Sequence, residues 1–318
     1  MRIFHDIREA DLPGPTFLTI GNFDGLHRGH QALLARLREN AQAQGGLSGL
    51  LTFHPHPLAV LRPETPLELL TSPPERLALA GEMGIDLGII QPFTAELAQL
   101  PPHDFLDLLT SHLGLRGLTV GPDFALGRNR SGTLAVLAEL GHTMGFALDV
   151  VQPVQVAGQE VRSYTIRQAI RAGAVEQVAE MLGRPYTVGG PVVHGDQRGR
   201  TIGVPTANLA VPPERLLPGD GVYATWAWVG DPALAPRYAS VTNIGMRPTV
   251  GGRERRVESH LFDFPGPGEA GDIYGQPVTL GFAQRLRAEQ RFDSFDALVA
   301  QIQRDMAQAR TLLQQSME

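Results

Sequence analysis

The chain has 318 residues, of which 42% are hydrophobic and 19% are charged, and its formal net charge is -6. This composition is typical of a globular protein, and the length is sufficient for two domains with separate cores. The negative charge argues against a general electrostatic grip on nucleic acid, which depends on a basic surface. The absence of cysteine excludes disulfides and thiolate metal sites.

The N-terminus, MRIFHDIREADLPG, lacks the long apolar run of a signal peptide, and no later segment resembles a membrane span. We therefore expect a cytoplasmic protein with small-molecule ligands and without a membrane or nucleic-acid partner. The chain contains no lysine, so a phosphate must be met by arginine, histidine, a bound metal or a helix end.

From Thr16 to about Leu182, short apolar segments alternate with segments of helical periodicity. The expected strands span residues 16–21, 45–57, 86–93 and 115–124, and the expected helices span residues 30–44, 73–83, 102–114 and 165–183. This alternation predicts an α/β domain with a doubly wound parallel sheet. Its ligands would lie at the carboxyl ends of the strands.

The first strand-to-helix turn, in TIGNFDGLHRGH, is a candidate phosphate site. Gly21, Gly25 and Gly29 permit close approach of the backbone to a ligand. His27 and His30 stand where the helix is expected to begin, and a helix N-terminus with imidazoles can bind phosphate oxygens. Two alternatives remain: histidines that are only solvated, and a metal site, although the zinc-peptidase pattern HExxH is absent.

After LGRPYTVGG the pattern changes to short strands separated by Gly and Pro. The expected strands span residues 186–195, 221–230, 237–245, 256–264 and 276–286, and a final helix spans residues 294–314. This spacing predicts a small antiparallel β-barrel or sandwich closed by a C-terminal helix. The end of helical periodicity places the domain boundary between residues 1–183 and 184–318.

Seven motifs follow one another along the chain: GNFDGLHRGH, FHPHP, VGPDFALG, GRTIGVPTANL, NIGMRPTVGG, VESHLFDF and DIYG. Together they resemble the bacterial bifunctional riboflavin kinase and FAD synthetase, and the resemblance covers nearly the whole chain. It implies a nucleotidyltransferase-like N-terminal domain that adenylylates FMN to FAD with release of pyrophosphate. It also implies a riboflavin kinase-like barrel that makes FMN, with ATP, riboflavin and FMN as substrates and Mg²⁺ as cofactor.

For the N-terminal domain, the resemblance implies that His27 and His30 act on the phosphates during catalysis. The three glycines of the turn and Asn22 would bind ATP beside them. Asp24 is assigned to the same site, although an aspartate in a turn is often only a cap.

A second phosphate-binding segment is expected in VRSYTIRQAI, which occupies the place of the family's Ser-Ser-Thr-x-Ile-Arg motif. Ser163 and Arg167 match that motif and are expected to bind phosphate. Arg162 and Tyr164 replace its first serine and its threonine, so the roles of those two hydroxyls are in doubt.

Two further residues of this domain are predicted to contact flavin or nucleotide. His56 in FHPHP and Asp123 in VGPDFALG both follow expected strands, which places them at the ligand edge of the sheet.

In the C-terminal domain, the resemblance assigns ATP binding to the glycine-rich loop that contains Gly195, Arg200 and Gly203. Thr206 and Asn208, in PTAN, would bind Mg²⁺, a hard cation that prefers oxygen ligands.

Glu258, in VESHLFDF, is implied to be the general base that takes the proton of the riboflavin 5′-hydroxyl as it attacks the γ-phosphate. The residues expected to bind or cover the flavin are Asn243, Arg247, Arg285, Arg287 and Glu289.

Three alternative functions can be distinguished by the flavin that the protein produces. A class I aminoacyl-tRNA synthetase also has a histidine turn, but this chain lacks a lysine loop and a basic surface. A flavin-binding module would be inactive, and a chain with only kinase activity would stop at FMN. Riboflavin, ATP and Mg²⁺ should therefore yield FAD, FMN alone, or neither.

Overall fold

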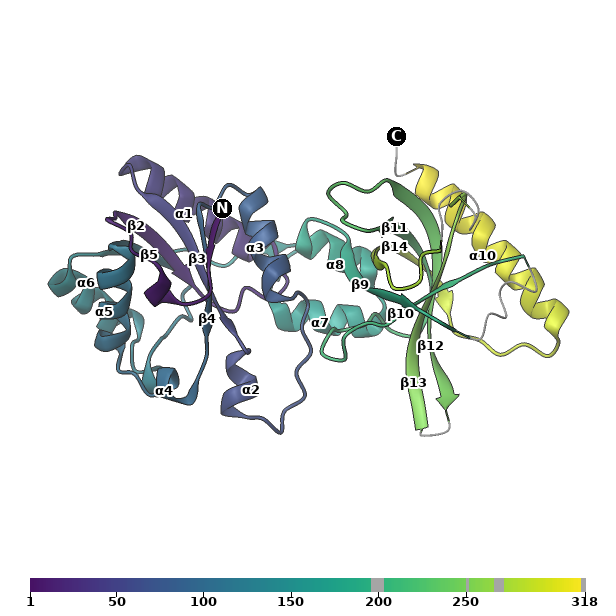
Figure 1. The fold of residues 1–318 in the computed structure, drawn as a ribbon, viewed down its shortest axis with the longest axis horizontal. Coiled ribbons are helices and arrows are strands. Elements are labelled where there is room, and N and C mark those ends of the chain that lie inside the picture. Colours follow the sequence, from purple (N-terminus) through teal and green to yellow (C-terminus); the bar gives the residue numbers. More distant parts are fainter. Residues whose placement is uncertain (196–202, 250–251, 266–271, 316–318) are drawn as a thin grey trace. The chain divides into compact units, whose positions relative to one another are not determined.

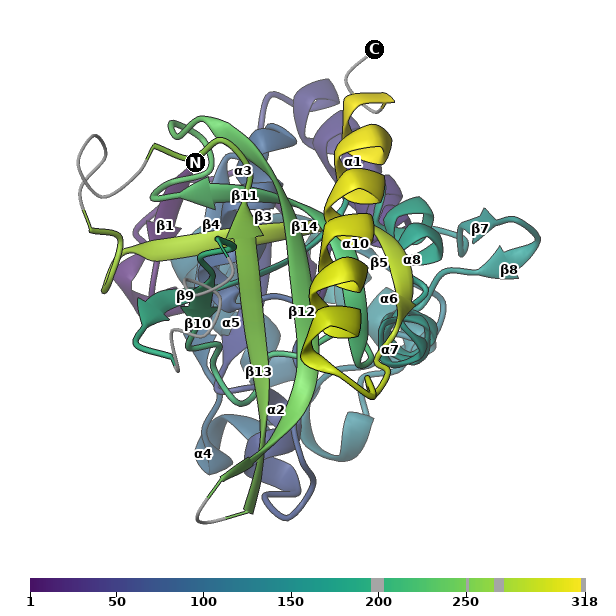
Figure 2. The ribbon, with the colours of Figure 1, turned by 90° about the vertical axis from the view of Figure 1, so that its right-hand side faces the viewer.

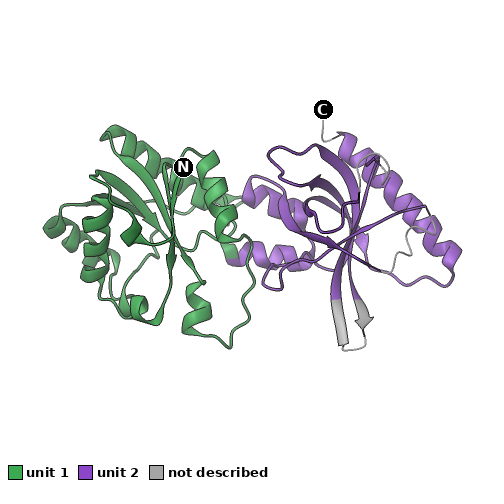
Figure 3. Ribbon diagram, in the orientation of Figure 1, with its two compact units in different colours: residues 1–163 green, residues 164–318 purple. Residues whose placement is uncertain are grey.

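A computed structural model of the chain describes residues 1–195, 203–249, 252–265 and 272–315, without the side chains of residues 247–249 and 252–254. The chain divides into two compact units, residues 1–163 and 164–318 (Figure 3). Each unit is described by itself below.

The N-terminal unit contains a six-stranded parallel sheet with the order β1-β4-β3-β2-β5-β6 (Figure 1). All residues of β2 are buried, and the connections run from β2 to β3 and β4 on one side and then to β5 and β6 on the other. Ligands bind at the carboxyl ends of the strands where the order reverses, which here is beside β2. The strands are β1 (Arg2–Phe4), β2 (Thr16–Ile20), β3 (Leu47–His54), β4 (Leu87–Pro92), β5 (Leu115–Val120) and β6 (Ala147–Val150).

Helices cover both faces of this sheet. α1 and α3 pack on the face that contains Phe17 and Leu50, whereas α5 and α6 pack on the face that contains Leu18 and Leu51. Successive strand residues point to opposite faces, so each buried strand contributes to two cores. The expected doubly wound α/β fold is confirmed. The helical elements up to residue 144 are η1 (Ile7–Glu9), α1 (Arg28–Ala43), α2 (Pro57–Leu61), α3 (Pro73–Glu82), α4 (Ala95–Ala98), α5 (Pro102–Leu113), η2 (Arg128–Arg130) and α6 (Leu134–Met144).

The segment between the sheet and the barrel differs from the prediction. A short hairpin of β7 (Gln155–Val156) and β8 (Gln159–Glu160) precedes α7 (Ser163–Ala172) and α8 (Val175–Leu182). The single helix expected over residues 165–183 is therefore wrong. Gly173 has a φ of +74°, a left-handed conformation that ends α7 and that favours glycine.

The C-terminal unit contains a closed barrel with the order β10-β13-β12-β11-β14-β9, in which neighbouring strands are antiparallel. The predicted small β-barrel with a C-terminal helix is confirmed. The strands are β9 (Tyr186–Val193), β10 (Ala207–Leu209), β11 (Gly221–Val229), β12 (Arg237–Thr249), β13 (Gly252–Leu261) and β14 (Pro277–Ala288), and the helix is α10 (Phe295–Gln315).

The inner and outer faces of the barrel wall can be told apart by what their side chains contact. Inside, the hydroxyl of Thr225 contacts those of Ser240 and Thr242 at 2.7 Å each, and Thr242 donates to Ser259 at 3.0 Å. Outside, α10 lies along the barrel (Figure 2) and packs against a cluster that includes Trp226. This alternation identifies the outward-facing residues of β12 and β13, which matter for the second site.

Candidate active sites

The turn between β2 and α1 begins at the ends of two central strands. The N–H of Gly21 donates to the Leu51 carbonyl at 3.0 Å, and the Asn22 carbonyl accepts a hydrogen bond from Thr52 Oγ1 at 3.2 Å. Gly25 has a φ of +85°, which a side chain would disfavour. The expected helix start is confirmed, because α1 begins at Arg28.

His27 and His30 form a stacked pair at the start of α1. His27 is the N-cap, and its Nδ1 accepts a hydrogen bond from the His30 N–H at 3.4 Å. The ring centroids are 3.7 Å apart with an angle of 17° between the planes. A Cβ on Gly29 would lie 3.2 Å from the His27 ring, so glycine leaves room for the stack. The pair lies at the positive end of the helix dipole, where an anion is favoured.

The His30 ring is uncharged near neutral pH. Burial lowers its pKa well below the ordinary value of 6.5, and electrostatic interactions with the neighbouring His27 and with the Arg76 guanidinium lower the pKa further. Within the residues that the structure describes, its buried Nδ1 has no hydrogen-bond partner. His30 can therefore meet a phosphate as a neutral hydrogen-bond donor, not as a cation. Among the described residues, no group of three or more His, Cys, Asp or Glu side chains could hold a metal ion.

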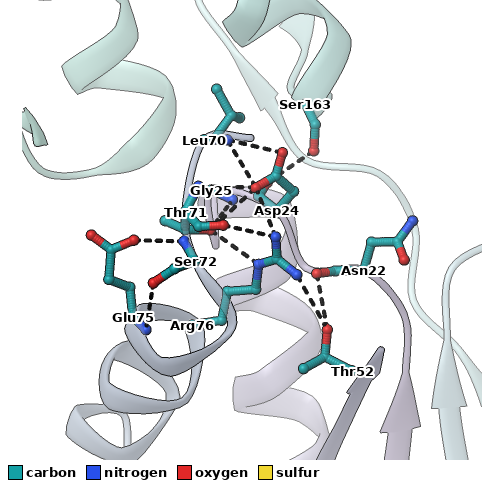
Figure 4. A network of polar contacts seen from close by, with 10 residues as sticks. All are labelled: Asn22, Asp24, Gly25, Thr52, Leu70, Thr71, Ser72, Glu75, Arg76 and Ser163. Carbon is teal, nitrogen blue, oxygen red and sulfur yellow. Dashed lines mark hydrogen bonds and ion pairs between the residues drawn. The ribbon is translucent and has the colours of Figure 1, made fainter. Parts of the chain in front are cut away.

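Asp24 connects this turn to the segment before α3 (Figure 4). Its carboxylate is 2% exposed and accepts hydrogen bonds from the N–H groups of Leu70 and Thr71 at 3.0 Å each. The guanidinium of Arg76 contacts the same carboxylate at 3.2 Å. These contacts give Asp24 a structural role, and its assignment to the ATP site stays a prediction.

Arg76 was missed by the sequence analysis. Its side chain is 1% exposed, although it lies on the first turns of α3. One signal was available: Arg76 precedes the apolar Ala80 by one helical turn, so a cation stood on the face expected to be buried. Such a cation needs a buried anion, but the sequence does not say which one.

Ser163 reaches the same turn from the other end of the unit. Its hydroxyl donates to the backbone carbonyl of Asp24 at 3.0 Å (Figure 4). Arg167 is half-buried and lies four residues further along α7, on the same helical face as Ser163. The structure thus brings Ser163 to the histidine turn, and phosphate binding by both residues stays a prediction.

Arg162, which departs from the family motif, pairs with Asp123 at 3.2 Å and with Glu160 at 2.9 Å. Asp123 follows β5 and is highly exposed. His56 follows β3 and caps α2, because its Nδ1 accepts the Leu58 N–H at 3.1 Å. Both Asp123 and His56 therefore lie at the ligand edge of the sheet.

In the barrel, strand register aligns the candidate kinase residues. Asn208 of β10 lies opposite Glu258 of β13, and Glu258 lies opposite Asn243 of β12. The same row continues through Val222 of β11 to Arg287 of β14. We call Asn208, Glu258, Asn243 and Arg287 the cross-strand row. The row lies on the outer face, since the adjacent residues on β12 and β13 point into the barrel.

Gly195, at the start of the glycine-rich segment, meets one end of this row. The backbone of Gly195 lies against the Asn208 side chain, because a Cβ there would be 2.3 Å from Nδ2. The Asn208 Oδ1 is buried and has no hydrogen-bond partner among the described residues. Thr206 is exposed just before β10, and Gly203 has a φ of +71° with open space around it. Arg200 lies outside the described residues.

A register shift separates the two arginines of β14. Arg287 lies opposite Val222 and forms an ion pair with Asp305 of α10 at 2.8 Å, whereas Arg285 lies opposite Tyr223. Neighbouring residues of β11 point to opposite faces, so the two arginines do as well. The flavin-binding role that the family resemblance implies for both arginines stays a prediction.

The remaining flavin candidates, Arg285, Glu289 and Arg247, do not belong to the cross-strand row. Arg285 donates to the carbonyls of Asp220 at 2.7 Å and Ala172 at 3.1 Å. The Glu289 carboxylate lies over Gly245, where a Cβ would be 2.2 Å from Oε1. Arg247 belongs to β12, but its side chain lies outside the described part of the chain.

The fold defines a class: an α/β nucleotidyltransferase-like domain followed by a kinase-like β-barrel. A family model described as FAD synthetase matches residues 10–165, and one described as riboflavin kinase matches residues 182–313. The chain belongs to the family of bifunctional riboflavin kinase/FMN adenylyltransferases. It is 40% identical to the member from Pseudomonas fluorescens over 297 residues, or 92% of each chain.

Other relatives agree over nearly the whole length. The Escherichia coli (strain K12) protein is 38% identical over 98% of this chain and 96% of its own length. The Bacillus subtilis (strain 168) protein is 32% identical over 96% of this chain and 94% of its own length. A solved structure titled a macrolide-efflux protein from Streptococcus pneumoniae is 29% identical, with a TM-score of 0.86, and covers 97% of this chain and 98% of its own. In the described part of this chain, no helix has the length and apolar character needed to cross a membrane.

The chain is therefore a bifunctional transferase. Its C-terminal domain phosphorylates riboflavin to FMN with ATP, and its N-terminal domain adenylylates FMN to FAD with release of pyrophosphate.

Proposed function

We propose that FAD is made at the turn between β2 and α1, and that FMN is made at the cross-strand row of the barrel. The first assignment is supported by the stacked His27 and His30 at the N-terminus of α1. The second is supported by the alignment of Asn208 and Glu258 beside the glycine-rich loop.

In adenylyl transfer, a phosphate oxygen of FMN attacks the α-phosphorus of ATP, and the bond from that phosphorus to the pyrophosphate oxygen breaks. The chain supplies position and charge stabilisation, not a covalent nucleophile. Because His27 Nδ1 accepts a hydrogen bond, the neutral ring has its proton on Nε2, which can donate to a phosphate. His30 donates as a neutral ring, and Ser163 and Arg167 act on the phosphates from α7.

In riboflavin phosphorylation, the 5′-hydroxyl oxygen attacks the γ-phosphorus while the bond from that phosphorus to the departing ADP oxygen breaks. The Glu258 carboxylate accepts the hydroxyl proton. Asn243, opposite Glu258 on the same face, orients the substrate beside this base. Arg287 is held by Asp305, so it shapes the flavin side of the row through α10.

A divalent cation fits the PTAN segment. The buried Asn208 Oδ1 has no hydrogen-bond partner in the described part of the chain, and Thr206 lies two residues earlier. Two neutral oxygens are therefore close in the sequence for a hard cation. We propose that Mg²⁺ is held there by Thr206 and Asn208. When bound, it would neutralise charge on the phosphate oxygens of ATP.

The two assignments can be tested in one polypeptide. FMN formation from riboflavin and FAD formation from supplied FMN are measured separately for His30→Ala and Glu258→Gln. Each variant should lose one activity and retain the other, so each activity controls for the other. Loss of both activities in both folded variants would remove the assignment of separate sites.

The domain boundary at residues 183/184 and the cytoplasmic location remain proposals. The lack of cysteine and the ATP-dependent chemistry support a reducing, ATP-containing compartment. The family models leave residues 166–181 unassigned, and the compact units divide at residue 163. Pieces beginning at Tyr164 and at Arg184 would show whether α7 and α8 are needed for kinase activity.

A further inference from the structure

We propose that Arg76 is a positioning residue for adenylyl transfer: paired with Asp24, it fixes the turn between β2 and α1 so that the stacked histidines meet ATP. The inference rests on the proposed role of His27 and His30. It assigns a function to a residue outside all seven sequence motifs.

The guanidinium of Arg76 makes contacts on every side of its planar fork. Nη2 donates to Asp24 Oδ1 at 3.2 Å and to the Thr71 carbonyl at 2.8 Å. Nε donates to Thr71 Oγ1 at 3.2 Å, and Nη1 reaches Thr52 Oγ1 at 3.5 Å. A lysine ammonium is a point charge that cannot span these acceptors. The site is therefore specific for arginine.

The groups held by Arg76 in turn hold the histidine turn at three points (Figure 4). The Thr71 hydroxyl accepts the Gly25 N–H at 2.8 Å, and the Thr52 hydroxyl donates to the Asn22 carbonyl at 3.2 Å. The third point is the carboxylate of Asp24 itself. All three points lie within five residues before His27, so a shift of Arg76 would move the histidines.

Stability alone does not explain this pair. A buried ion pair often contributes no more stability than apolar side chains of similar volume, because both charges lose their hydration. Arg76 and Asp24 are 1% and 2% exposed, so each would pay that desolvation cost. The geometry that the pair imposes on the turn supplies a reason for retaining it.

The charge of Arg76 also acts on His30. Arg76 on α3 and His27 at the start of α1 lower the His30 pKa, in addition to the larger effect of burial. Asp24 is the anion of the same network, so its removal leaves the Arg76 charge uncompensated. The two members of the pair should therefore shift the His30 pKa in opposite directions when each is neutralised.

The test uses the full chain with Arg76→Lys, Arg76→Gln, Asp24→Asn and the double variant Asp24→Asn/Arg76→Gln. Arg116→Gln is the matched control, because Arg116 is exposed on β5 and donates to the Gly145 carbonyl, outside the Arg76 network. Each variant is assayed for kcat and KM of FAD formation and for FMN formation. The His30 pKa is followed by NMR of the ring.

Arg76→Lys and Arg76→Gln should each lower the kcat of FAD formation by at least about tenfold, since small misplacements of reacting groups are costly. FMN formation should be unchanged. The His30 pKa should rise in Arg76→Gln and fall in Asp24→Asn, and the double variant should lose less activity than the two single losses multiplied together.

A wild-type kcat of FAD formation in Arg76→Lys or in a folded Arg76→Gln would overturn the proposal. If Arg76→Gln fails to fold, Arg76→Lys and the double variant decide, because neither leaves a lone buried charge. His30→Ala separates this inference from the proposed function. If His30→Ala keeps full FAD formation, the proposed role of the histidines is wrong. If Arg76→Lys keeps full FAD formation and His30→Ala loses it, only the positioning role of Arg76 is wrong.

Discussion

The two sites of this enzyme differ in how their residues are brought together. At the proposed adenylyltransferase site, the histidines and glycines lie within a single turn of the chain, and a strand and a helix present them. At the proposed kinase site, the cross-strand row takes one residue from each of four strands, and Asn208 and Arg287 stand far apart in the sequence.

This difference changes what each site is sensitive to. The histidine turn depends on its anchors, because Asp24 and Arg76 are the buried link between the turn and α3. The cross-strand row depends on register, because a slip of one residue would turn each side chain to the opposite face of the barrel. Mutations that test the sites should therefore separate by activity and by mechanism.

The largest expected effect is at the kinase row. Glu258→Gln keeps the size of the side chain but cannot accept a proton as a carboxylate does. We expect FMN formation to fall about 10²–10⁴-fold while adenylylation of supplied FMN persists. Single-turnover phosphorylation and thermal melting are measured together. An undiminished chemical step in a folded variant would remove Glu258 from the mechanism.

The next effect is at the histidine turn. His30→Ala removes a donor from the stacked pair, and loss of one charge-stabilising donor costs about 10²–10³ in rate. FAD formation should fall by that order, and FMN formation should stay near wild type. Steady-state assays of both reactions in one preparation check this. Equal losses in the two activities would contradict the separation of the sites.

A smaller effect is expected at the far end of the row. Asn208→Ala removes the buried Oδ1 that fits a cation, so FMN formation should fall about 10–100-fold and need more Mg²⁺. The readout is the rate as a function of Mg²⁺ concentration. Asn208→Asp, which keeps the oxygen, is the control, and it should retain more activity than Asn208→Ala at low Mg²⁺.

The smallest effect concerns pH and stability. The His30 pKa is lower in the folded state than its ordinary value of 6.5, so the unfolded state takes up the proton first as pH falls. The N-terminal domain should therefore lose stability below about pH 6.5, with a slope of at most about 1.4 kcal/mol per pH unit. His30→Gln should remove this slope.

Hydrogen exchange of β2 and α1 measures that stability locally. Both tryptophans, Trp226 and Trp228, lie on β11, so tryptophan fluorescence reports the barrel separately. The His30 substitution should leave the fluorescence transition unchanged at every pH. A pH slope in exchange that survives His30→Gln would assign the effect to another group.

Much of the architecture could be predicted from local pattern. The alternation of strands and helices, the start of α1 and the change to short strands are properties of single segments, so periodicity and turn residues reveal them. The sequence could not distinguish a closed barrel from a sandwich, because both have the same strand signals and differ only in which edge strands pair.

The sequence by itself determined the change between two fold patterns and the histidine turn, because these depend on order and spacing along the chain. The candidate residues of both sites followed from the resemblance of its seven motifs to a known family. Only the tertiary structure decided that Arg76 pairs with Asp24, that Arg285 and Arg287 face different partners, and that α7 ends at Gly173. The physical reason is that burial of a charge, strand register and the fit around a glycine each depend on segments distant in the chain.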